Sequence, residues 1–384
     1  MVSALASELK RPRKICLATL APFVGGAEIA AERLALGLQE AGHEVLVVIG
    51  TQGEVMARMQ QLGLRCIFLP MYFTDKWRGW RYYRARRNLQ QLLKREQPDV
   101  VHSNDLPTHQ IISDAAMRLG LPRVCHHRFS FSGLAIDWFN KYGAERHLFV
   151  SRALMDELCK SSARLLGSKR AVVYDGLFLP EQPTEPKRQE ARSELGLSPQ
   201  KVLVTFAGQI IERKGVADLL QAWALVDSKV RNHAELLLIG DDLQGNGRYC
   251  MEMQQLATHL QCNARFFGFQ KDVGKWLVAS DIAVVPSHIE PLGNATLEAM
   301  SYALPALGCK VGGIPEVIVH EQTGLLVPPH NPKQLAKAIT SLICSTDLRV
   351  SYGLEARKRC EQIFSIQAHV KNMLNEYAKV LKNA

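Results

Sequence analysis

The sequence predicts an α/β protein with two Rossmann-like, parallel-sheet domains. In each half of the chain, short apolar runs of strand length alternate with helical segments, which is the pattern of doubly wound parallel sheets. Between the halves, residues 179–188 contain three prolines and several charges, so we expect neither a central strand nor a helix there. We therefore expect domains over residues 1–178 and 201–364, a linker with the start of the second domain over 179–200, and a final helical segment over 365–384.

Composition and charge narrow the class of protein. Apolar residues make up 47% and charged residues 22% of the chain, as in an ordinary soluble protein. The net charge of +10 favours anionic partners, which include sugar nucleotides, anionic lipid and nucleic acid. The nine cysteines are scattered without a C-x-x-C pair, so we expect reduced thiols in a cytoplasmic protein. No apolar run has the length of a membrane span or follows the basic N-terminal residues as a signal peptide would.

The first half opens with a β-α-β unit. We expect a strand over residues 14–20, a turn containing Gly25 and Gly26, a helix to residue 40 and a second strand over 43–50. The turn does not have the G-x-G-x-x-G pattern, which argues against a nicotinamide dinucleotide as ligand.

Polar side chains follow the next two predicted strands. The strand over residues 98–105 ends on His102, Asn104 and Asp105. The strand over 121–129 ends on His126, His127 and Arg128, and further strands follow over 146–151 and 170–176. Ligands of doubly wound sheets bind at the carboxyl ends of the strands, so these side chains are candidates for a site.

A basic and aromatic helix interrupts this half. Residues 76–87 hold six basic and four aromatic side chains, and the basic character continues through Lys94 to Arg95. For the part between Trp77 and Arg95, an anionic membrane surface is one interpretation and nucleic acid a second. The third is a solvated helix whose aromatic side chains pack inward.

The second half repeats the alternation of strands and helices. We expect strands over residues 201–208, 235–242, 264–269 and 281–286, and helices over 216–225 and 366–381. After the strand over 281–286, a loop with Glu290 and Gly293 leads into a helix at Asn294 or the residue after it. The free N–H groups and the dipole of such a helix start form an anion site.

Two carboxylates frame this predicted anion site. Glu290 lies on the loop and Glu298 about one turn into the helix, eight residues later. Carboxylates repel a phosphate, but they accept hydrogen bonds from hydroxyl groups beside it. Together these features describe a nucleotide sugar, whereas the plainer interpretation is that both glutamates only complement the helix dipole.

The same residues resemble a known family. Residues 290–300 are similar to the E-x7-E element of retaining GT-B glycosyltransferases of family 4, and residues 311–316 and 321–328 are similar to the sequence that follows it. The resemblance covers essentially the whole chain. It implies a GT-B fold, in which two Rossmann-like domains face each other across a cleft and the C-terminal helix crosses back to the first domain.

The resemblance also implies roles for individual residues. The loop from Gly208 to residue 215 is similar to the family's GR-x4-KG loop, whose Arg and Lys hold the diphosphate; Lys214 matches, but Gln209 stands in place of the Arg, and Arg213 is a substitute. Arg128 aligns with a sugar-facing His of the family, although His126 and His127 stay alternatives, and Tyr174-Asp175 replaces the Pro-Asn of a "PNG" segment. The remaining implied contacts are Glu290 to the sugar, Glu298 to the ribose, Gly25, Gly26, Leu292, Gly293 and Asn294 to phosphate, Gly268, Phe269 and Gln270 to the base, and Asn104 and Asp105 on the acceptor side.

These features predict a retaining, hexose-transferring glycosyltransferase. The expected partners are a nucleotide sugar and a glycan or lipid-linked acceptor of cell-envelope or polysaccharide synthesis, such as lipopolysaccharide, with no nucleic acid. No D-x-D pair occurs in the chain, so we expect no metal and no cofactor in the transfer. We expect the protein in the cytoplasm, at the inner membrane face. The alternatives are a non-catalytic glycan- or nucleotide-binding GT-B protein and a nucleotide-dependent oxidoreductase.

Overall fold

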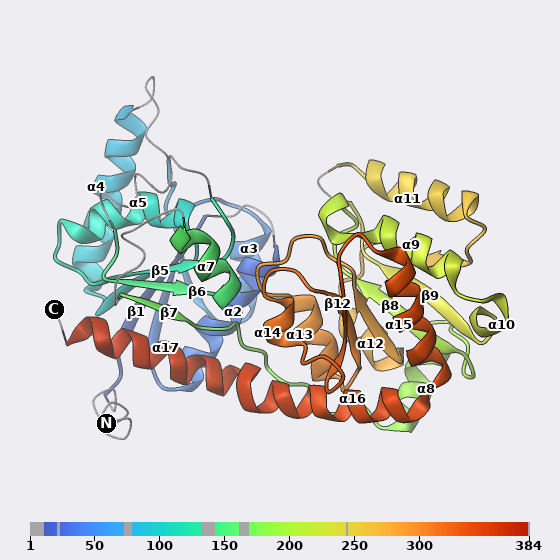
Figure 1. Ribbon diagram of the computed structural model, residues 1–384. Coiled ribbons are helices and arrows are strands. Elements are labelled where there is room, and N and C mark those ends of the chain that lie inside the picture. Colours follow the sequence, from blue (N-terminus) through green and yellow to red (C-terminus); the bar gives the residue numbers. More distant parts are fainter. Residues whose placement is uncertain are drawn as a thin grey trace. The chain divides into compact units, whose positions relative to one another are not determined.

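The computed structural model describes residues 11–20, 24–72, 79–131, 143–160, 169–242 and 245–382. The chain forms two compact units (Figure 1): unit 1 contains the chain up to Phe178 and again from Ser365, and unit 2 contains Leu179–Phe364. The sequence-based predictions also concern residues outside the described ones, namely residues 1–10, residues 21–23 of the first turn, residues 76–78 of the basic helix and residues 383–384 of the final segment.

Unit 1 is built on a seven-stranded parallel sheet. The strand order is β3-β2-β1-β4-β5-β6-β7, so the chain reverses its direction of winding between β1 and β4. The strands are β1 Lys14–Thr19, β2 Glu44–Ile49, β3 Arg65–Phe68, β4 Val100–Ser103, β5 Arg123–His127, β6 Arg146–Phe149 and β7 Arg170–Val172.

Helices cover both faces of this sheet. Alternate strand residues such as Ile15 and Leu17 pack on one set of helices, and Cys16 and Ala18 between them pack on the other, as the period of two in a strand requires. The first face holds α2 Gly26–Glu40, α3 Glu54–Gln61 and α17 Ile366–Leu381, the second holds α4 Gly79–Glu96 and α5 Leu106–Met117, and α7 Arg152–Lys160 follows β6.

The C-terminal helix α17 is part of unit 1, as the family resemblance implied. Its residues Ile366 and Val370 pack so tightly on α2 that a Cβ added at Gly37 would lie 2.7–2.8 Å from their side chains. The hydroxyl group of Tyr377 lies 2.5 Å from Nδ1 of His102 in β4. Buried apolar and polar contacts therefore hold α17 to this sheet.

Unit 2 contains a six-stranded parallel sheet of the same kind. Its order is β10-β9-β8-β11-β12-β13, with the reversal between β8 and β11. The strands are β8 Val202–Ala207, β9 Ala234–Ile239, β10 Ala264–Phe266, β11 Ile282–Val285, β12 Ala306–Cys309 and β13 Gly324–Val327.

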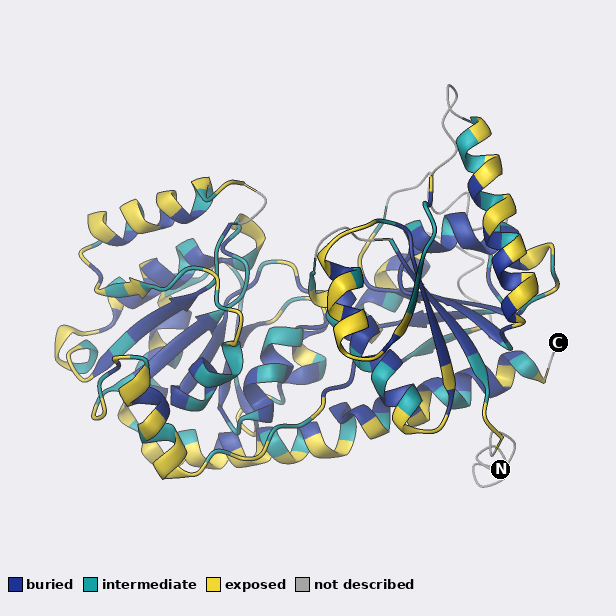
Figure 2. Ribbon diagram, turned by 180° about the vertical axis from the view of Figure 1, so that it is seen from behind, coloured by how far each residue is buried: buried dark blue, intermediate teal, exposed yellow. Residues whose placement is uncertain are grey.

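The helices of unit 2 also lie on both faces of their sheet, whose strands are mostly buried except for the edge strand β10 (Figure 2). One face packs on α9 Val216–Leu225, α11 Arg248–His259 and α15 Pro332–Cys344, and the other on α8 Glu185–Glu194, α12 Val273–Ala279 and α13 Asn294–Ser301. The remaining helical segments are η2 Glu212–Lys214, α10 Ser228–Arg231, α14 Ile314–Val317, α16 Thr346–Arg359 and η3 Cys360–Phe364.

The predicted fold class is confirmed, and one element prediction is wrong. Residues 179–188 were expected to contain no helix, but α8 begins at Glu185. Pro186 lies in the first turn of α8, where a helix needs no N–H donor, so the proline fits there without cost. Among the described residues, no helix is both long and apolar enough to cross a bilayer.

Candidate functional site

The winding reversal in unit 2 brings two of the predicted loops together. Strands β8 and β11 are neighbours in the sheet, and the chain after each one leads into the predicted site. The first loop runs over residues 208–215 and carries Lys214; the second runs over 286–293 and carries Glu290. In doubly wound sheets this reversal point is where ligands bind.

Lys214 and Glu290 form an ion pair across these loops. The Nζ atom of Lys214 donates to Oε2 of Glu290 at 2.5 Å, and the two side chains are 14% and 11% exposed. The hydroxyl group of Ser287 also donates to Oε2 of Glu290, at 3.2 Å. The sequence-predicted cation and acid are thus held in direct contact and still reach solvent.

The backbone fixes this contact. Gly215 has φ of +68° and lies so close to the second loop that a Cβ would be 2.0 Å from the carbonyl oxygen of Pro286. The N–H group of His288 donates to the carbonyl oxygen of Arg213 at 2.8 Å. Only glycine permits both the left-handed conformation and the close approach at position 215.

The start of α13 lies at the end of the second loop. Gly293 caps the helix with φ of +108° and offers no side chain to the first-turn N–H groups. Leu292 before it is buried, and Asn294 is the first helical residue. The hydroxyl group of Thr296 is buried and has no hydrogen-bond partner among the described residues. An anion bound here would meet backbone donors and a hydroxyl group.

Glu298 is placed by α13 rather than by the ion pair. It lies in the second turn of the helix and is half-buried. Glu290 forms the ion pair with Lys214, and its Cγ would lie 3.7 Å from a Cβ added at Gly293. The E-x7-E spacing therefore corresponds to one loop residue and one helix residue on either side of the helix start.

Three glycines align the ends of β8, β9 and β10. The N–H group of Gly240 donates to the carbonyl oxygen of Gly268 at 2.8 Å, and a Cβ on Gly240 would lie 1.8 Å from the carbonyl oxygen of Gly208. Beyond Gly268, Phe269 is exposed and Gln270 donates to the carbonyl oxygen of Phe267 at 2.7 Å. The segment predicted to contact a base is therefore close to the first loop.

The missing arginine of the GR-x4-KG pattern is not replaced by an ordered cation. Gln209 is half-buried and carries no charge, and Arg213 is exposed without an ion pair among the described residues. Lys214 is thus the cation that the described part of unit 2 brings to Glu290.

Unit 1 gathers its predicted residues at its own winding reversal. The side-chain amide of Asn104, which follows β4, donates to the carbonyl oxygen of Ala27 at 3.0 Å and so links the end of β4 to the start of α2. Gly25 caps α2 and donates its N–H to the Glu28 carboxylate at 3.2 Å, and Gly26 is exposed. Burial raises the pKa of Glu28, so this helix start already holds an acid.

Arg128 forms a buried ion pair with Asp175. Its Nη1 atom lies 2.7 and 2.8 Å from the two carboxylate oxygens, and its Nε donates to Oδ1 of Asn104 at 2.8 Å. Arg128 and Asp175 are the residues at which the sequence departs from the family pattern near β5 and near the "PNG" segment. The two residues that depart from the family pattern therefore form an ion pair with each other.

The structure separates the two histidines that precede Arg128. The ring of His127 stacks on Phe149 with centroids 4.7 Å apart, and burial lowers the pKa of His127 to about 3. His126 is fully buried, burial lowers its pKa, and neither of its ring nitrogens has a partner among the described residues. The Nη2 atom of Arg128 is also buried without a hydrogen-bond partner among the described residues. His126 and Arg128 thus keep polar atoms for a bound hydroxyl group or water, whereas His127 is packed among aromatic rings.

Asp105, predicted on the acceptor side, caps a helix. Its side chain accepts from the N–H group of Thr108 at 2.7 Å at the start of α5. Burial raises the pKa of Asp105. Asn104 and Asp105 therefore both have structural contacts in unit 1, and their predicted contact with an acceptor stays a prediction.

Sequence reasoning did not select Ser287 and Thr296. Both hydroxyl groups lie beside predicted residues, Ser287 on Glu290 and Thr296 at the start of α13. Their position next to Glu290 and Gly293 in the sequence is the signal that could have identified them.

The GT-B fold of glycosyltransferases consists of two doubly wound parallel-sheet units, and its C-terminal helix belongs to the first unit. The solved structure of Anabaena Alr3699/HepE in complex with UDP-glucose has this fold: it matches with a TM-score of 0.83 and 22% identity, covering 97% of this chain and 100% of that one. Residues 25–174 match the family model of the glycosyl transferase 4-like domain, and residues 187–359 match that of glycosyl transferases group 1. The chain belongs to this glycosyltransferase family.

Two curated relatives match nearly the whole chain. An uncharacterized glycosyltransferase of Methanocaldococcus jannaschii is 26% identical over 381 residues, covering 92% of this chain and 94% of the relative. The N-acetyl-alpha-D-glucosaminyl L-malate synthase of Bacillus anthracis is 24% identical, covering 95% and 97%. Nucleotide-sugar-dependent glycosyl transfer is the activity of this family, and the oxidoreductase alternative has no further basis.

Proposed function

We propose that the protein is a retaining glycosyltransferase that moves a hexose from a nucleoside diphosphate sugar to a glycan or lipid-linked acceptor. The observation that carries this proposal is the Lys214–Glu290 pair beside the uncapped start of α13, at the winding reversal of unit 2. This arrangement offers a cation, the start of a helix without a side-chain cap and a carboxylate within two adjacent loops.

Lys214 and the start of α13 would hold the diphosphate. A diphosphate carries more negative charge than a carboxylate, so an arriving donor competes with Glu290 for the ammonium group of Lys214. The first-turn N–H groups of α13 and the hydroxyl group of Thr296 are then available to the other phosphate oxygens. These groups stabilise the leaving diphosphate as negative charge develops on it.

The two glutamates would hold the rings on either side of the diphosphate. Once Lys214 binds phosphate, Glu290 can accept hydrogen bonds from the sugar hydroxyls, while Ser287 keeps its carboxylate oriented. Glu298 would accept from the ribose hydroxyls and the segment from Gly268 to Gln270 would lie against the base. In unit 1, His126 and Arg128 would bind substrate hydroxyls through their unpaired polar atoms.

The relatives support a hexosyl donor. The Anabaena structure contains UDP-glucose, and the name of the Bacillus anthracis enzyme contains an N-acetylglucosaminyl group. We propose that transfer needs no metal ion, because Lys214 and the α13 start supply the positive charge. We also propose that the acceptor belongs to cell-envelope synthesis. The protein would work at the inner membrane face, to which it would bind through α4.

A donor screen tests this proposal. UDP-, GDP-, ADP- and CMP-linked sugars would be compared by thermal shift, and the stabilising donor would then be used in a transfer or donor-hydrolysis assay with and without EDTA. We expect one nucleotide class to stabilise the protein, and NMR of the product to show the anomeric configuration of the donor. An inverted product would contradict retention, and a loss of turnover in EDTA that Mg²⁺ or Mn²⁺ restores would contradict metal independence.

The non-catalytic alternative has one observation in its favour. Uncharged Gln209 replaces the arginine expected to hold the diphosphate, and Arg213 is exposed and forms no ion pair among the described residues. A protein that binds nucleoside diphosphate but neither transfers nor hydrolyses any donor of the screen would fit this alternative. A Gln209→Arg variant that gains turnover in the same assay would show that the missing cation is the reason.

A further inference from the structure

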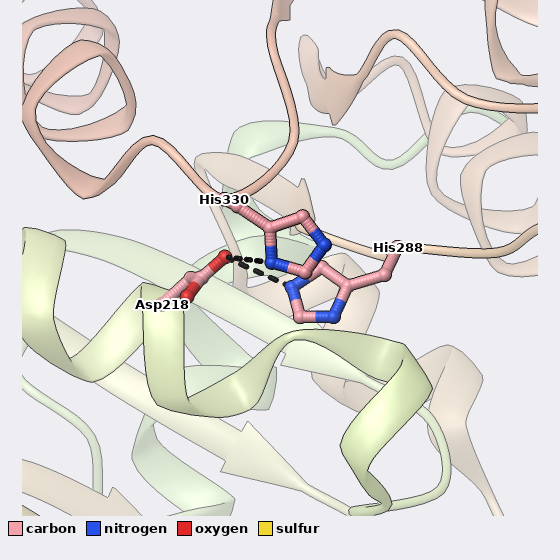
Figure 3. A group of neighbouring side chains, drawn as sticks. All are labelled: Asp218, His288 and His330. Atoms are coloured by element: carbon pink, nitrogen blue, oxygen red, sulfur yellow. Dashed lines mark hydrogen bonds and ion pairs between the residues drawn. The ribbon is translucent and has the colours of Figure 1, made fainter.

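Three metal-ligating side chains lie together in unit 2, apart from the residues proposed for transfer. Asp218 comes from the first turn of α9, His288 from the loop after β11, and His330 from the turn between β13 and α15. Figure 3 shows that one nitrogen of each imidazole ring is directed at the same carboxylate of Asp218. We infer that Asp218, His288 and His330 form a binding site for a divalent transition-metal ion, with Zn²⁺ as the expected ion.

The distances fit a common ion. Nε2 of His288 lies 2.9 Å and Nδ1 of His330 lies 3.9 Å from Oδ2 of Asp218, and all three ligand atoms lie within 4.8 Å of one another. Tetrahedral zinc with bonds of 2.0–2.1 Å holds its ligands about 3.3 Å apart. Small side-chain rotations therefore bring the three atoms to the spacing that zinc requires, and an ion would separate two rings whose centroids are now 3.8 Å apart.

The donor set selects the kind of metal. Two imidazole nitrogens and one carboxylate suit zinc and its neighbours in the first transition row, whereas magnesium and calcium prefer oxygen ligands alone. The side chain of His330 is 67% exposed, so the cluster is reached from solvent and leaves at least one coordination position for water.

The backbone at His330 suggests a suitable variant for testing the site. This residue has φ of +54°, a left-handed conformation that glycine adopts freely and that costs free energy for a histidine. The variant His330→Gly therefore removes the imidazole ring and leaves a residue that adopts the same backbone conformation without strain.

The inferred ion would connect the loops that hold the candidate active site. His288 lies two residues before Glu290 and is hydrogen-bonded through its N–H group to Arg213, and Asp218 follows Lys214 by four residues. Bound zinc would therefore hold both loops to the β13–α15 turn. It would take no part in the proposed transfer chemistry, and this inference does not rest on the proposed function.

Zinc titration of the full-length protein, freed of any histidine tag and treated with EDTA, tests the inference without an activity assay. By calorimetry we expect one Zn²⁺ per chain and no comparable binding of Mg²⁺. The variant His330→Gly, whose glycine suits the backbone, should bind zinc at least about tenfold more weakly, since even residues that only support ligands contribute this much. His259→Ala, an exposed histidine of α11, should bind as the wild type does.

A spectroscopic measurement separates loss of the metal site from loss of the fold. Bound Co²⁺ reports imidazole and carboxylate ligands by its visible absorption, and Asp218→Asn should abolish this absorption in protein whose circular dichroism is unchanged. The inference is overturned if the wild type binds no zinc, or if His330→Gly and Asp218→Asn bind it as tightly as the wild type.

Discussion

The contact between Arg128 and Asp175 shows what a single sequence can and cannot provide at the scale of residues. Each residue could be recognised as a departure from the family pattern, but 47 positions separate them and no spacing rule joins them. The sequence also left His126, His127 and Arg128 as equal alternatives. Strand alternation in β5, which puts His127 among aromatic rings, resolves part of that choice.

Breaking this ion pair should destabilise unit 1. The variant Asp175→Asn leaves a buried guanidinium without its carboxylate, which costs about 3–5 kcal/mol in the free energy of unfolding. The double variant Arg128→His with Asp175→Asn, which restores the family residues at both positions, should recover most of this loss because it buries no unpaired charge.

Urea denaturation measures both effects. Asp156→Asn, an exposed acid of α7 in the same unit, is the matched control and should stay within about 0.5 kcal/mol of the wild type. A single Asp175→Asn variant as stable as the wild type would show that the pair contributes nothing to the fold.

Elements with one dominant local signal were predicted to the residue, and others were not. Helices α9 and α17 begin and end where the sequence indicated, since an apolar periodicity and nearby Gly215 or Ser365 define their starts. Strands β3, β12 and β13 were not predicted because none has a strong strand signal: β3 is only partly buried and begins with an arginine, and β12 and β13 each contain a glycine, which weakens strand propensity. The start of α8 was missed because its proline was interpreted as a helix breaker rather than as a first-turn residue.

Helix α4 has the composition of an interfacial helix on its exposed side. Leu89 and Leu93 are buried against the sheet and α5, whereas Trp80 and Tyr83 are 61% and 59% exposed. The exposed side also carries Arg84, Arg87, Lys94 and Arg95. The alternative of a solvated helix whose aromatic side chains pack inward is therefore wrong for Trp80 and Tyr83, and the membrane interpretation stays a prediction.

Charge reversal on α4 tests membrane binding. Because each basic residue near an anionic bilayer contributes about 1 kcal/mol, Arg84→Glu with Arg87→Glu should weaken binding to anionic vesicles by at least about 30-fold in co-sedimentation. Lys333→Glu with Lys337→Glu, two exposed positions on α15, is the charge-matched control. Equal pelleting of both double variants, or equal binding of the wild type to neutral vesicles, would rule out an electrostatic contact through α4.

At the scale of the whole molecule, the two units differ in their histidines. All seven histidines of unit 1 are buried, and burial lowers the pKa of each one. The five histidines of unit 2 are exposed or half-buried. The sequence shows twelve histidines but not this division, because the division depends on which strands and helices pack against each other in the folded unit.

Unit 1 should therefore lose stability in mild acid. An unfolded histidine takes up a proton near pH 6.5, but burial lowers the pKa of His109 and His369 to about 4, so the folded unit stays unprotonated. As the pH falls from 6.5 toward 4, each such group costs up to about 1.4 kcal/mol per pH unit, and the full stability is present above pH 6.5. The raised pKa values of Glu28 and Asp105 act in the opposite direction, but these are only two carboxyl groups, compared with seven buried histidines.

Hydrogen exchange between pH 7 and pH 5, corrected for the intrinsic pH dependence of exchange, measures this effect. Peptides from the unit 1 sheet should lose protection more steeply than peptides from the unit 2 sheet, which serve as the internal reference. A parallel loss in both units would contradict the assignment to buried histidines.

The central claim is that Lys214 and Glu290 form the donor site, and a comparison of three proteins in one transfer assay tests it most directly. With the donor identified by the screen, Lys214→Ala should lower kcat by about 10²–10³-fold, as expected for removing one preorganised group from a leaving diphosphate, while remaining folded. Lys229→Ala, an exposed lysine of α10, should transfer at the wild-type rate. Equal turnover of Lys214→Ala and Lys229→Ala would contradict the account.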